Sequence, residues 1–368
     1  MSAEVRMHWH DQDVTFVDRL VVRDAPDLPD GEFGIGDLVP AWDASQVREI
    51  PLAEMALRRR YGPPLSLYDG RFYPRRLAGT TLSDGDGMQP MRVLKVHDDR
   101  VRVDLNAPLA RFPVRVEVVG SQWASALDAE PLSTLITAGV GMQAKPPEAG
   151  RVTWLDEHAL RCEDEADDAQ FYGPARLVHH LDANARALLA ARYDEELRPG
   201  VQVLDLMSSW TSHLPGKPAD VHVVGLGMNA EELAANPDLA ERVRHDLNRQ
   251  PTLPFDTARF DLVLCSVSIE YLREPIAVLA DVARVLKPGG RVVIAFSDRW
   301  FPTKAVRVWS ELHPFQRPAL VLHYLRKAGG FADYRAESTQ GVARPADDRY
   351  AAQRRSSDPL FVVSATRI

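Results

Sequence analysis

The second half of the chain alternates short apolar segments with stretches of helical periodicity. Apolar runs at 201–206, 221–224, 260–265 and 291–296 are interspersed with helical patterns. Consecutive strand–helix units connect through right-handed crossovers, so they build a parallel sheet with helices on both faces. We therefore expect an α/β fold over 171–368.

Helical patterns locate the elements between these strands. The longest covers 175–197, where leucines recur at helical spacing and Pro199-Gly200 ends the pattern. Further helices are expected at 230–233, 276–286, 304–312 and 318–327, and further strands at 334–338 and 360–365. These elements continue the alternation almost to the last residue.

The first 120 residues carry a different pattern, in which polar and apolar residues alternate. This period of two is typical of half-buried antiparallel strands. We therefore expect a mostly β domain over 1–120, followed by a connecting segment over 121–170. Strands are expected at 14–17, 19–22, 91–96, 100–104 and 114–119, with a hairpin turn at 97–99.

The connecting segment holds two stretches of biased composition. Residues 145–150 are rich in proline and indicate a linker, and residues 162–169 form an acidic run. Runs of like charge are usually solvated, so we expect the acidic run to be a surface loop.

Charge and cysteine content narrow the possible functions. The 368 residues carry a net charge of −8, which disfavours binding to nucleic-acid phosphates. Cys162 and Cys265 are too few for a disulfide framework or a cysteine zinc site, so no metal is expected. The first residues lack a secretory signal, and no apolar run reaches the ~20 residues of a membrane span. We expect a cytoplasmic protein that binds neither nucleic acid nor membrane.

The motifs of the α/β half follow one another in a specific order. Asp205 ends the first strand, Asp246 follows the second, and a Lys-Pro-Gly-Gly turn at 287–290 precedes the strand at 291–296. This order resembles a class I S-adenosylmethionine (SAM) dependent methyltransferase of the type 11-like branch. The resemblance covers 171–338 and implies a Rossmann-like sheet, methyl transfer and SAM as the cofactor.

The end of the first strand departs from the family pattern. The family has a glycine-rich turn there, whereas this chain has Met207, Ser208, Ser209 and Trp210. The resemblance implies that Asp205 and Met207 to Ser209 contact the amino-acid end of SAM. The serine hydroxyls would replace the glycines as donors, and Trp210 would lie close to the acceptor. The alternative is that Asp205 only caps the next helix.

The resemblance assigns cofactor contacts to three more strand ends. Asn229 stands where the family has an acid for the ribose hydroxyls, and Asp246 stands where an acid accepts from the adenine amine. As alternatives, Asp246 caps a turn and Met228 packs in the core. The implied cofactor-binding residues at these ends are Gly227, Met228, Asn229, Asp246, Leu247, Asn248, Ser266 and Val267.

Two segments, 171–180 and 297–304, fall where family members build the acceptor pocket. Our candidate catalytic residues there are Tyr172, Arg176, His180 and Arg299. On a helix over 175–197, Arg176 and His180 would share a face, and a histidine can take a proton near neutral pH. The alternative is a structural role for His180. We favour a small thiol or sulfide as acceptor, because a thiolate needs little beyond a dry pocket. A hydroxyl or carbon acceptor stays open.

The N-terminal half carries a second resemblance. Its parts are a glycine-rich segment at 31–37, a Tyr-Gly-Pro-Pro stretch at 61–64, and an Asp-x-Asn-x-Pro-Leu-Ala pattern at 104–110 before a strand. These resemble the SlyD-like branch of the FKBP-type prolyl isomerases, with an insert-in-flap region at 45–94. The resemblance implies a structural, lid-forming or dimerising appendage, and hence a possible homodimer.

Two other functions were compared with methyl transfer. A folding helper with a degenerate SAM-binding domain is motivated by the missing glycines and the missing ribose acid. A nucleotide-dependent oxidoreductase is disfavoured, because no strand is followed by Gly-x-Gly-x-x-Gly.

Overall fold

The computed structural model describes residues 2–23, 32–34, 36, 39–57, 65–82, 89–127, 152, 155–156 and 158–368. The proline-containing stretches at 61–64 and 145–150, and residues 31, 35 and 37 of the glycine-rich segment at 31–37, lie outside the described residues.

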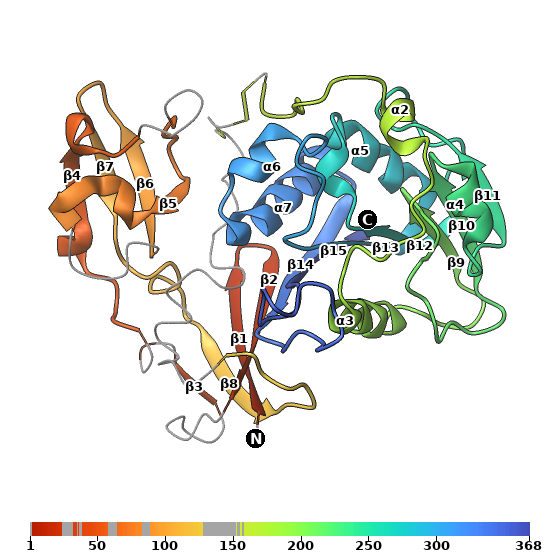
Figure 1. The fold of residues 1–368 in the computed structure, drawn as a ribbon, viewed down its shortest axis with the longest axis horizontal. Coiled ribbons are helices and arrows are strands. Elements are labelled where there is room, and N and C mark those ends of the chain that lie inside the picture. Colours follow the sequence, from red (N-terminus) through yellow and green to blue (C-terminus); the bar gives the residue numbers. More distant parts are fainter. Residues whose placement is uncertain are drawn as a thin grey trace.

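A large mixed sheet forms the centre of the C-terminal half (Figure 1). Its strand order is β11-β10-β9-β12-β13-β15-β14, and it continues through β2-β1-β8-β3. The five strands from β9 to β13 pair in parallel, and β15 is antiparallel to both neighbours. The strands are β9 (Gln202–Leu206), β10 (His222–Gly227), β11 (Glu241–Arg244), β12 (Phe260–Ser266), β13 (Leu286–Phe296), β14 (Phe331–Gln340) and β15 (Leu360–Arg367). The expected Rossmann-like sheet is thus confirmed over this half.

Helices cover both faces of the sheet, because successive strand residues point to opposite sides. Val203 of β9 belongs to a core with α3 (Ala183–Asp194). Its neighbour Leu204 belongs to a second core with α5 (Pro275–Val285) and α7 (Arg317–Ala328). Figure 1 shows α3 on the side of the sheet opposite to α5 and α7.

The first long helix is shorter than its leucine pattern predicts. α3 begins at Ala183, because the Asp182 carboxylate caps it by accepting from the backbone N–H groups of Asn184 and Ala185, at 3.0 and 3.1 Å. The segment at 175–182 is not helical. The prediction that Arg176 and His180 share a helix face is therefore wrong. The other helices are α2 (Asp168–Tyr172), α4 (Ala230–Ala235) and α6 (Arg307–Glu311).

The strands within 1–120 belong to two different sheets. β2 (Val14–Arg23) pairs in parallel with β14 and so joins the large sheet. β1 (Ser2–Asp11), which the sequence did not indicate, pairs with β2, and Trp9 stacks on Phe16 at 3.7 Å between ring centroids. β8 (Arg115–Gly120) and β3 (Glu32–Gly34) complete this edge.

The remaining N-terminal strands form a separate four-stranded sheet in the order β4-β7-β6-β5, which stands apart in Figure 1. The expected hairpin turn joins β6 to β7, where the His97 N–H donates to the Arg100 carbonyl at 2.9 Å. This sheet has its own apolar core. The FKBP-like domain and its boundary near residue 120 stay predictions. The strands are β4 (Val47–Pro51), β5 (Phe72–Pro74), β6 (Pro90–Val96) and β7 (Arg100–Asp104).

Candidate active site

A cavity opens beyond the carboxyl ends of β9, β10 and β12. All of the site residues predicted from the sequence line it except Arg299, whose guanidinium lies over the Tyr350 ring at 4.6 Å. Their individual roles stay predictions. The lining residues among them are Tyr172, Arg176, His180, Asp205, Met207, Ser208, Ser209, Gly227, Met228, Asn229, Asp246, Leu247, Asn248, Ser266 and Val267.

The turn after β9 is held by hydroxyl–carboxylate hydrogen bonds. The hydroxyls of Ser208 and Ser212 both donate to Oδ2 of the buried Asp205, at 2.6 and 2.7 Å. Ser209 Oγ donates to Oε2 of Glu232 at 2.6 Å. The hydroxyl protons of Ser208 and Ser209 are therefore directed at protein carboxylates, and the contact of these serines with the cofactor stays a prediction. Burial raises the pKa of Asp205 to about 6, and the two serine bonds oppose that rise.

The turn after β9 requires a glycine on the neighbouring strand β10, at Gly227. Met207 takes a left-handed φ of 58°, which turns the chain so that the Ser208 N–H donates to the Leu226 carbonyl at 2.7 Å. A Cβ added at Gly227 would lie 2.2 Å from the Ser208 carbonyl oxygen. Only glycine allows β10 to approach the turn this closely.

The end of β10 provides an acid that the sequence analysis missed. Asn229 accepts from the N–H groups of Glu231 and Glu232 and donates to the carbonyls of Tyr172 and Gly173, so both ends of its amide bind protein. The Glu232 carboxylate lines the cavity and accepts from the Arg176 N–H at 2.7 Å. The Asn-x-x-Glu spacing of a capping box is the signal that could have identified Glu232.

The polar side chains of Asp246 and Asn248 also form hydrogen bonds with other protein groups. Asp246 accepts from the N–H groups of Asn248 and Arg249, as in the turn-capping alternative. Asn248 donates to Asp168 and to the Tyr271 carbonyl. Asp168 is buried and lines the cavity, so the prediction of a solvated acidic run is wrong at this residue. Lys304 Nζ, at 3.0 Å from Asp168 Oδ1, compensates the charge of the carboxylate.

Aromatic rings and histidines line one part of the cavity. The Arg176 guanidinium lies 4.6 Å from the centre of the Phe171 ring and 5.6 Å from that of Phe301. The rings of His180 and Phe301 are 5.2 Å apart. Burial lowers the pKa of His180, and it lowers the pKa of the nearby His213 to about 4. Both imidazoles are therefore neutral bases at pH 7.

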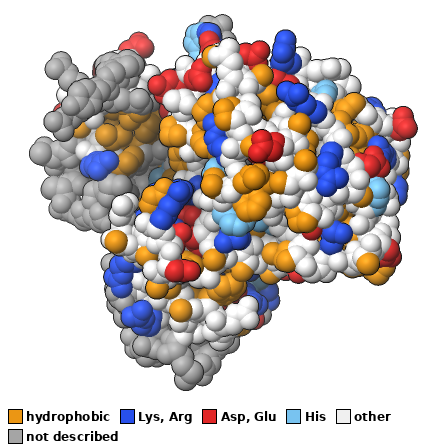
Figure 2. All heavy atoms as spheres, turned by 45° about the vertical axis from the view of Figure 1, so that its right-hand side comes forward, with side chains coloured by type: hydrophobic (Ala, Val, Ile, Leu, Met, Phe, Trp, Pro, Cys, Tyr) orange, Lys and Arg blue, Asp and Glu red, His pale blue; other side chains and the backbone are white. Residues whose placement is uncertain are grey.

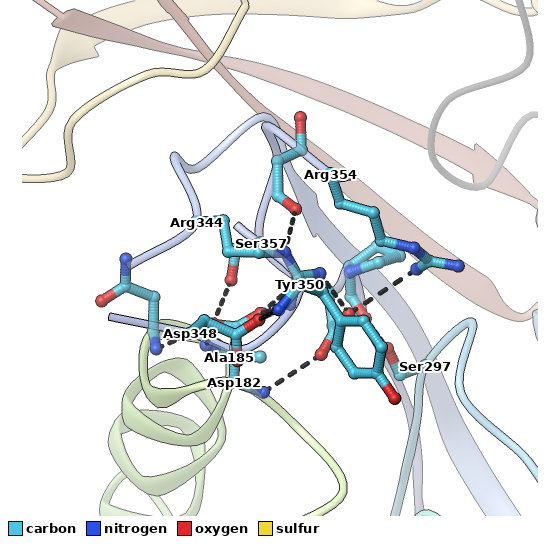
Figure 3. A network of polar contacts seen from close by, with 12 residues as sticks. Asp182, Ala185, Ser297, Arg344, Asp348, Tyr350, Arg354 and Ser357 are labelled. Carbon is cyan, nitrogen blue, oxygen red and sulfur yellow. Dashed lines mark hydrogen bonds and ion pairs between the residues drawn. The ribbon is translucent and has the colours of Figure 1, made fainter. Parts of the chain in front are cut away.

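A buried ion-pair network holds the wall segment that precedes α3 (Figure 3). The Arg344 guanidinium contacts three carboxylates, those of Asp182, Asp348 and Asp358. Ser357 Oγ donates to Asp182 at 2.7 Å, and the Asp182 N–H donates to Asp358 at 3.0 Å. The C-terminal segment before β15 thereby fixes the position of the chain that carries His180 and its neighbours. We call these residues the Arg344 cluster.

The surface beside the cavity carries mixed charge and a small apolar area. In the view of Figure 2, basic and acidic side chains are interspersed. Leu177 and Val178 are 47% and 49% exposed, and Val178 lines the cavity. Within the described residues, no helix is long and apolar enough to cross a membrane. The same residues contain no cluster of three or more histidine, cysteine or acidic side chains that could hold a metal ion.

Comparison with known proteins identifies the reaction class. Residues 208–294 match a family described as a methyltransferase domain. The C-terminal half of the chain carries a SAM-dependent methyltransferase domain. SAM is its cofactor, and the cavity fits this cation, because the Glu232 carboxylate and the rings of Tyr172 and Phe301 face the same space.

The methyltransferase domain resembles proteins with assigned names. The chain is 39% identical over 116 residues to a demethylmenaquinone methyltransferase of Beutenbergia cavernae, covering 30% of this chain and 47% of that protein. It is 26% identical over 200 residues to a ubiquinone/menaquinone biosynthesis C-methyltransferase UbiE of Laribacter hongkongensis, covering 52% and 77%. The chain thus spans about half the length of the first of these relatives.

Among solved structures, a SAM-dependent methyltransferase from Mesorhizobium loti aligns over 50% of this chain and 98% of its own. The TM-score is 0.35 and the sequence identity is 20%.

Proposed function

We propose that the protein transfers a methyl group from SAM to a carbon of a hydroxylated aromatic, quinol-type small molecule. The observation that carries this proposal is the aromatic wall at the strand ends of a methyltransferase domain. Tyr172, Tyr271 and Phe301 line the cavity together, with centroid distances of 5.9 and 6.3 Å within the group. A planar ring can stack against such a wall. The names of the two relatives, a demethylmenaquinone methyltransferase and a ubiquinone/menaquinone biosynthesis C-methyltransferase, support a quinone-type acceptor, and the second name supports a carbon acceptor.

The exposed pair Leu177 and Val178 adds to this proposal. Both side chains lie beside the cavity at nearly half exposure, and contact with an apolar substituent of the acceptor would remove them from water. A quinol that carries a short alkyl chain should therefore bind more tightly than the unsubstituted ring.

A small thiol or sulfide is the second candidate acceptor. His180 and His213 line the cavity with lowered pKa values, and a neutral imidazole can take a proton from a thiol. This candidate predicts methyl transfer to sulfur with no preference for an aromatic ring.

The experiment begins with calorimetric titration of SAM and S-adenosylhomocysteine into the full chain. A panel of dihydroxynaphthalenes, catechols and thiols then follows, and mass spectrometry assigns the methyl group to carbon, oxygen or sulfur. The proposal expects C-methylated naphthols. S-methylated thiols alone would overturn it in favour of the second candidate. Gly227→Ala is the matched negative control, because its Cβ would collide with the turn at Ser208.

A folding helper remains the alternative for the N-terminal half. Refolding of a proline-limited test protein distinguishes it, because an isomerase accelerates that slow phase. Acceleration without methylation of any acceptor would support the helper.

A further inference from the structure

Arg176 places a guanidinium in the cavity without an acidic partner. Its side chain lines the cavity, and it forms no ion pair with any carboxylate of the described residues. Within the same part of the chain, its side chain makes one hydrogen bond, from Nη1 to the Pro174 carbonyl, and that contact is long at 3.5 Å. A guanidinium has five N–H donors, so most of those of Arg176 remain available to a ligand.

A second cation at the same aromatic ring is fully paired. Lys304 Nζ lies 5.5 Å from the centre of the Phe171 ring, and the Arg176 guanidinium lies 4.6 Å from it. Lys304 donates to two backbone carbonyls and to the Asp168 carboxylate, at 3.0 to 3.1 Å. The fold therefore uses the charge of Lys304, whereas the charge of Arg176 has no such partner.

The acidic residues of the cavity lining are bound to other groups. Glu232 and Asp205 accept from serine hydroxyls of the turn after β9. Asp246 accepts from two backbone N–H groups, and Asp168 pairs with two cations at 3.0 Å. In the described structure none of the four forms an ion pair with Arg176. An anionic ligand would give Arg176 the partner that the protein does not.

The position of Arg176 favours the methyl acceptor as the source of that negative charge. The guanidinium lies 5.6 Å from the centre of the Phe301 ring, and Phe301 belongs to the aromatic wall against which we propose that the acceptor stacks. A guanidinium that rests on aromatic rings keeps its in-plane N–H fork free to bind a carboxylate. A substituent on an acceptor ring at Phe301 would therefore lie within reach of this fork.

We propose that Arg176 selects acceptors that carry a carboxylate, so that the substrate class is a hydroxylated, quinol-type aromatic acid. This inference rests on the proposed function. Two N–H groups of the guanidinium would bind the two carboxylate oxygens side by side, which orients the aromatic ring as well as holding it. The orientation of the ring decides which of its carbons meets the methyl group, so Arg176 would determine both the affinity and the position of methylation.

The carboxylate of SAM is the rival partner, because it has the same chemistry. The two cases differ in which binding step the loss of Arg176 would weaken. If Arg176 binds the acceptor, its loss weakens binding of the acceptor and leaves SAM binding almost unchanged. If Arg176 binds the cofactor, its loss weakens SAM binding and leaves the choice between charged and neutral acceptors unchanged.

Matched probes test the inference by calorimetry. A dihydroxynaphthoic acid, its carboxamide and the unsubstituted dihydroxynaphthalene are titrated into the full chain saturated with S-adenosylhomocysteine. The acid should bind the parent roughly 10- to 100-fold more tightly than the carboxamide, as expected for hydrogen bonds between charged groups. Arg176→Gln should reduce this preference to about threefold or less and should keep the Kd for SAM within about twofold. Arg176→Lys should retain part of the preference, because lysine keeps the charge and loses the fork.

Arg349→Gln is the matched control. Arg349 also lies against an aromatic ring, 4.7 Å from the centre of Tyr350, but it does not line the cavity. The charges of Arg349 and Arg176 both act on His180, so this variant tests whether positive charge without contact is sufficient. An equal loss of acid binding in Arg349→Gln would overturn the proposal, as would a loss of SAM binding alone in Arg176→Gln.

Methylation of the same probes separates this inference from the proposed function. C-methylation of the acid in preference to the carboxamide, with that preference lost in Arg176→Gln, would support both. Equal methylation of all the probes would overturn selection by Arg176 and leave the proposed function in place. Binding of the acid that depends on Arg176, without methylation of any probe, would refute the proposed function while the carboxylate site stands.

Discussion

Two groups of buried charges flank the cavity, and they differ in how completely they are paired. In the Arg344 cluster one guanidinium contacts three carboxylates, and Ser357 and the backbone add further hydrogen bonds. At Glu270, in a short 3-10 helix (Ile269–Tyr271) beyond β12, neither carboxylate oxygen has a side-chain partner among the described residues, and Arg317, whose charge acts on the carboxyl, makes no ion pair with it. The first arrangement holds a wall in place. The second leaves a carboxyl whose pKa is raised by burial to about 8.

The largest loss of stability is expected from breaking the Arg344 cluster. Arg344→Met would remove the guanidinium that contacts the Asp182, Asp348 and Asp358 carboxyls, two of which are almost fully buried, and among the described residues only Asp358 would keep a cation, Arg354 at 3.7 Å. Loss of one partner of a buried ion pair costs about 3–5 kcal/mol. Urea denaturation should show this loss, together with weaker SAM binding, because the segment before α3 would be released. An unchanged denaturation midpoint would contradict a scaffolding role.

Removing the charge of Glu270 should raise the free energy of unfolding, whereas Arg344→Met should lower it. The folded-state pKa of Glu270 is raised above its ordinary value, so its stability contribution is complete in acid and is lost as the pH rises through about 8. Glu270→Gln lacks this loss and should be more stable than the parent by roughly 1–3 kcal/mol at neutral pH. Thermal unfolding between pH about 5 and about 9 should show a gap that widens with pH. A variant less stable at every pH would mean that Glu270 has a structural partner.

A smaller change is expected at the turn after β9. Ser208→Ala removes one of the two hydroxyls that donate to Asp205, and a lost hydrogen bond to a charged group costs about 1.5–3 kcal/mol. The remaining Ser212 bond should keep the loss near the lower end. Calorimetry should show weaker SAM binding, and Ser310→Ala, in α6 and outside the cavity lining, is the matched control. Equal SAM affinity in both variants would mean that this hydroxyl does not organise the turn.

The sequence was sufficient to predict the sheet and the cavity. The apolar runs of β9, β10, β12 and β13 are largely buried on both faces, so these strands could be predicted from composition, whereas the charged and mostly exposed β11 was not predicted. β1 was missed because Arg6, His8 and His10 alternate with its buried Val5, Met7 and Trp9, and charged residues weaken a strand signal. The pairing of β2 with β14 joins segments more than 300 residues apart, and no local pattern records such a contact.

The residues that were missed at the site share one property. Glu232, Asp168 and Glu270 are acids whose burial or cavity position depends on tertiary packing, and only Glu232 had a local signal, the Asn-x-x-Glu spacing at the start of α4. The prediction that Arg176 and His180 share a helix face was wrong, because the cap at Asp182 competes with the leucine periodicity and begins α3 later. Local periodicity predicts which face of a helix or strand is buried. The partners of a buried charge are set by residues far away in the sequence, so periodicity does not predict them.

The smallest effect tests whether pairing matters only when it is buried. Arg354 borders the Arg344 cluster, where it bonds Asp298 at 3.0 Å and lies 3.7 Å from Asp358, but its side chain is 43% exposed. Exposed ion pairs contribute about 0–1 kcal/mol, so Arg354→Ala should change the free energy of unfolding by no more than that and should leave SAM affinity unchanged. High salt should abolish even this difference, whereas the effect of Arg344→Met should persist, since water and ions do not reach a buried pair. A loss in Arg354→Ala as large as that in Arg344→Met would show that the two arginines hold the wall as one unit.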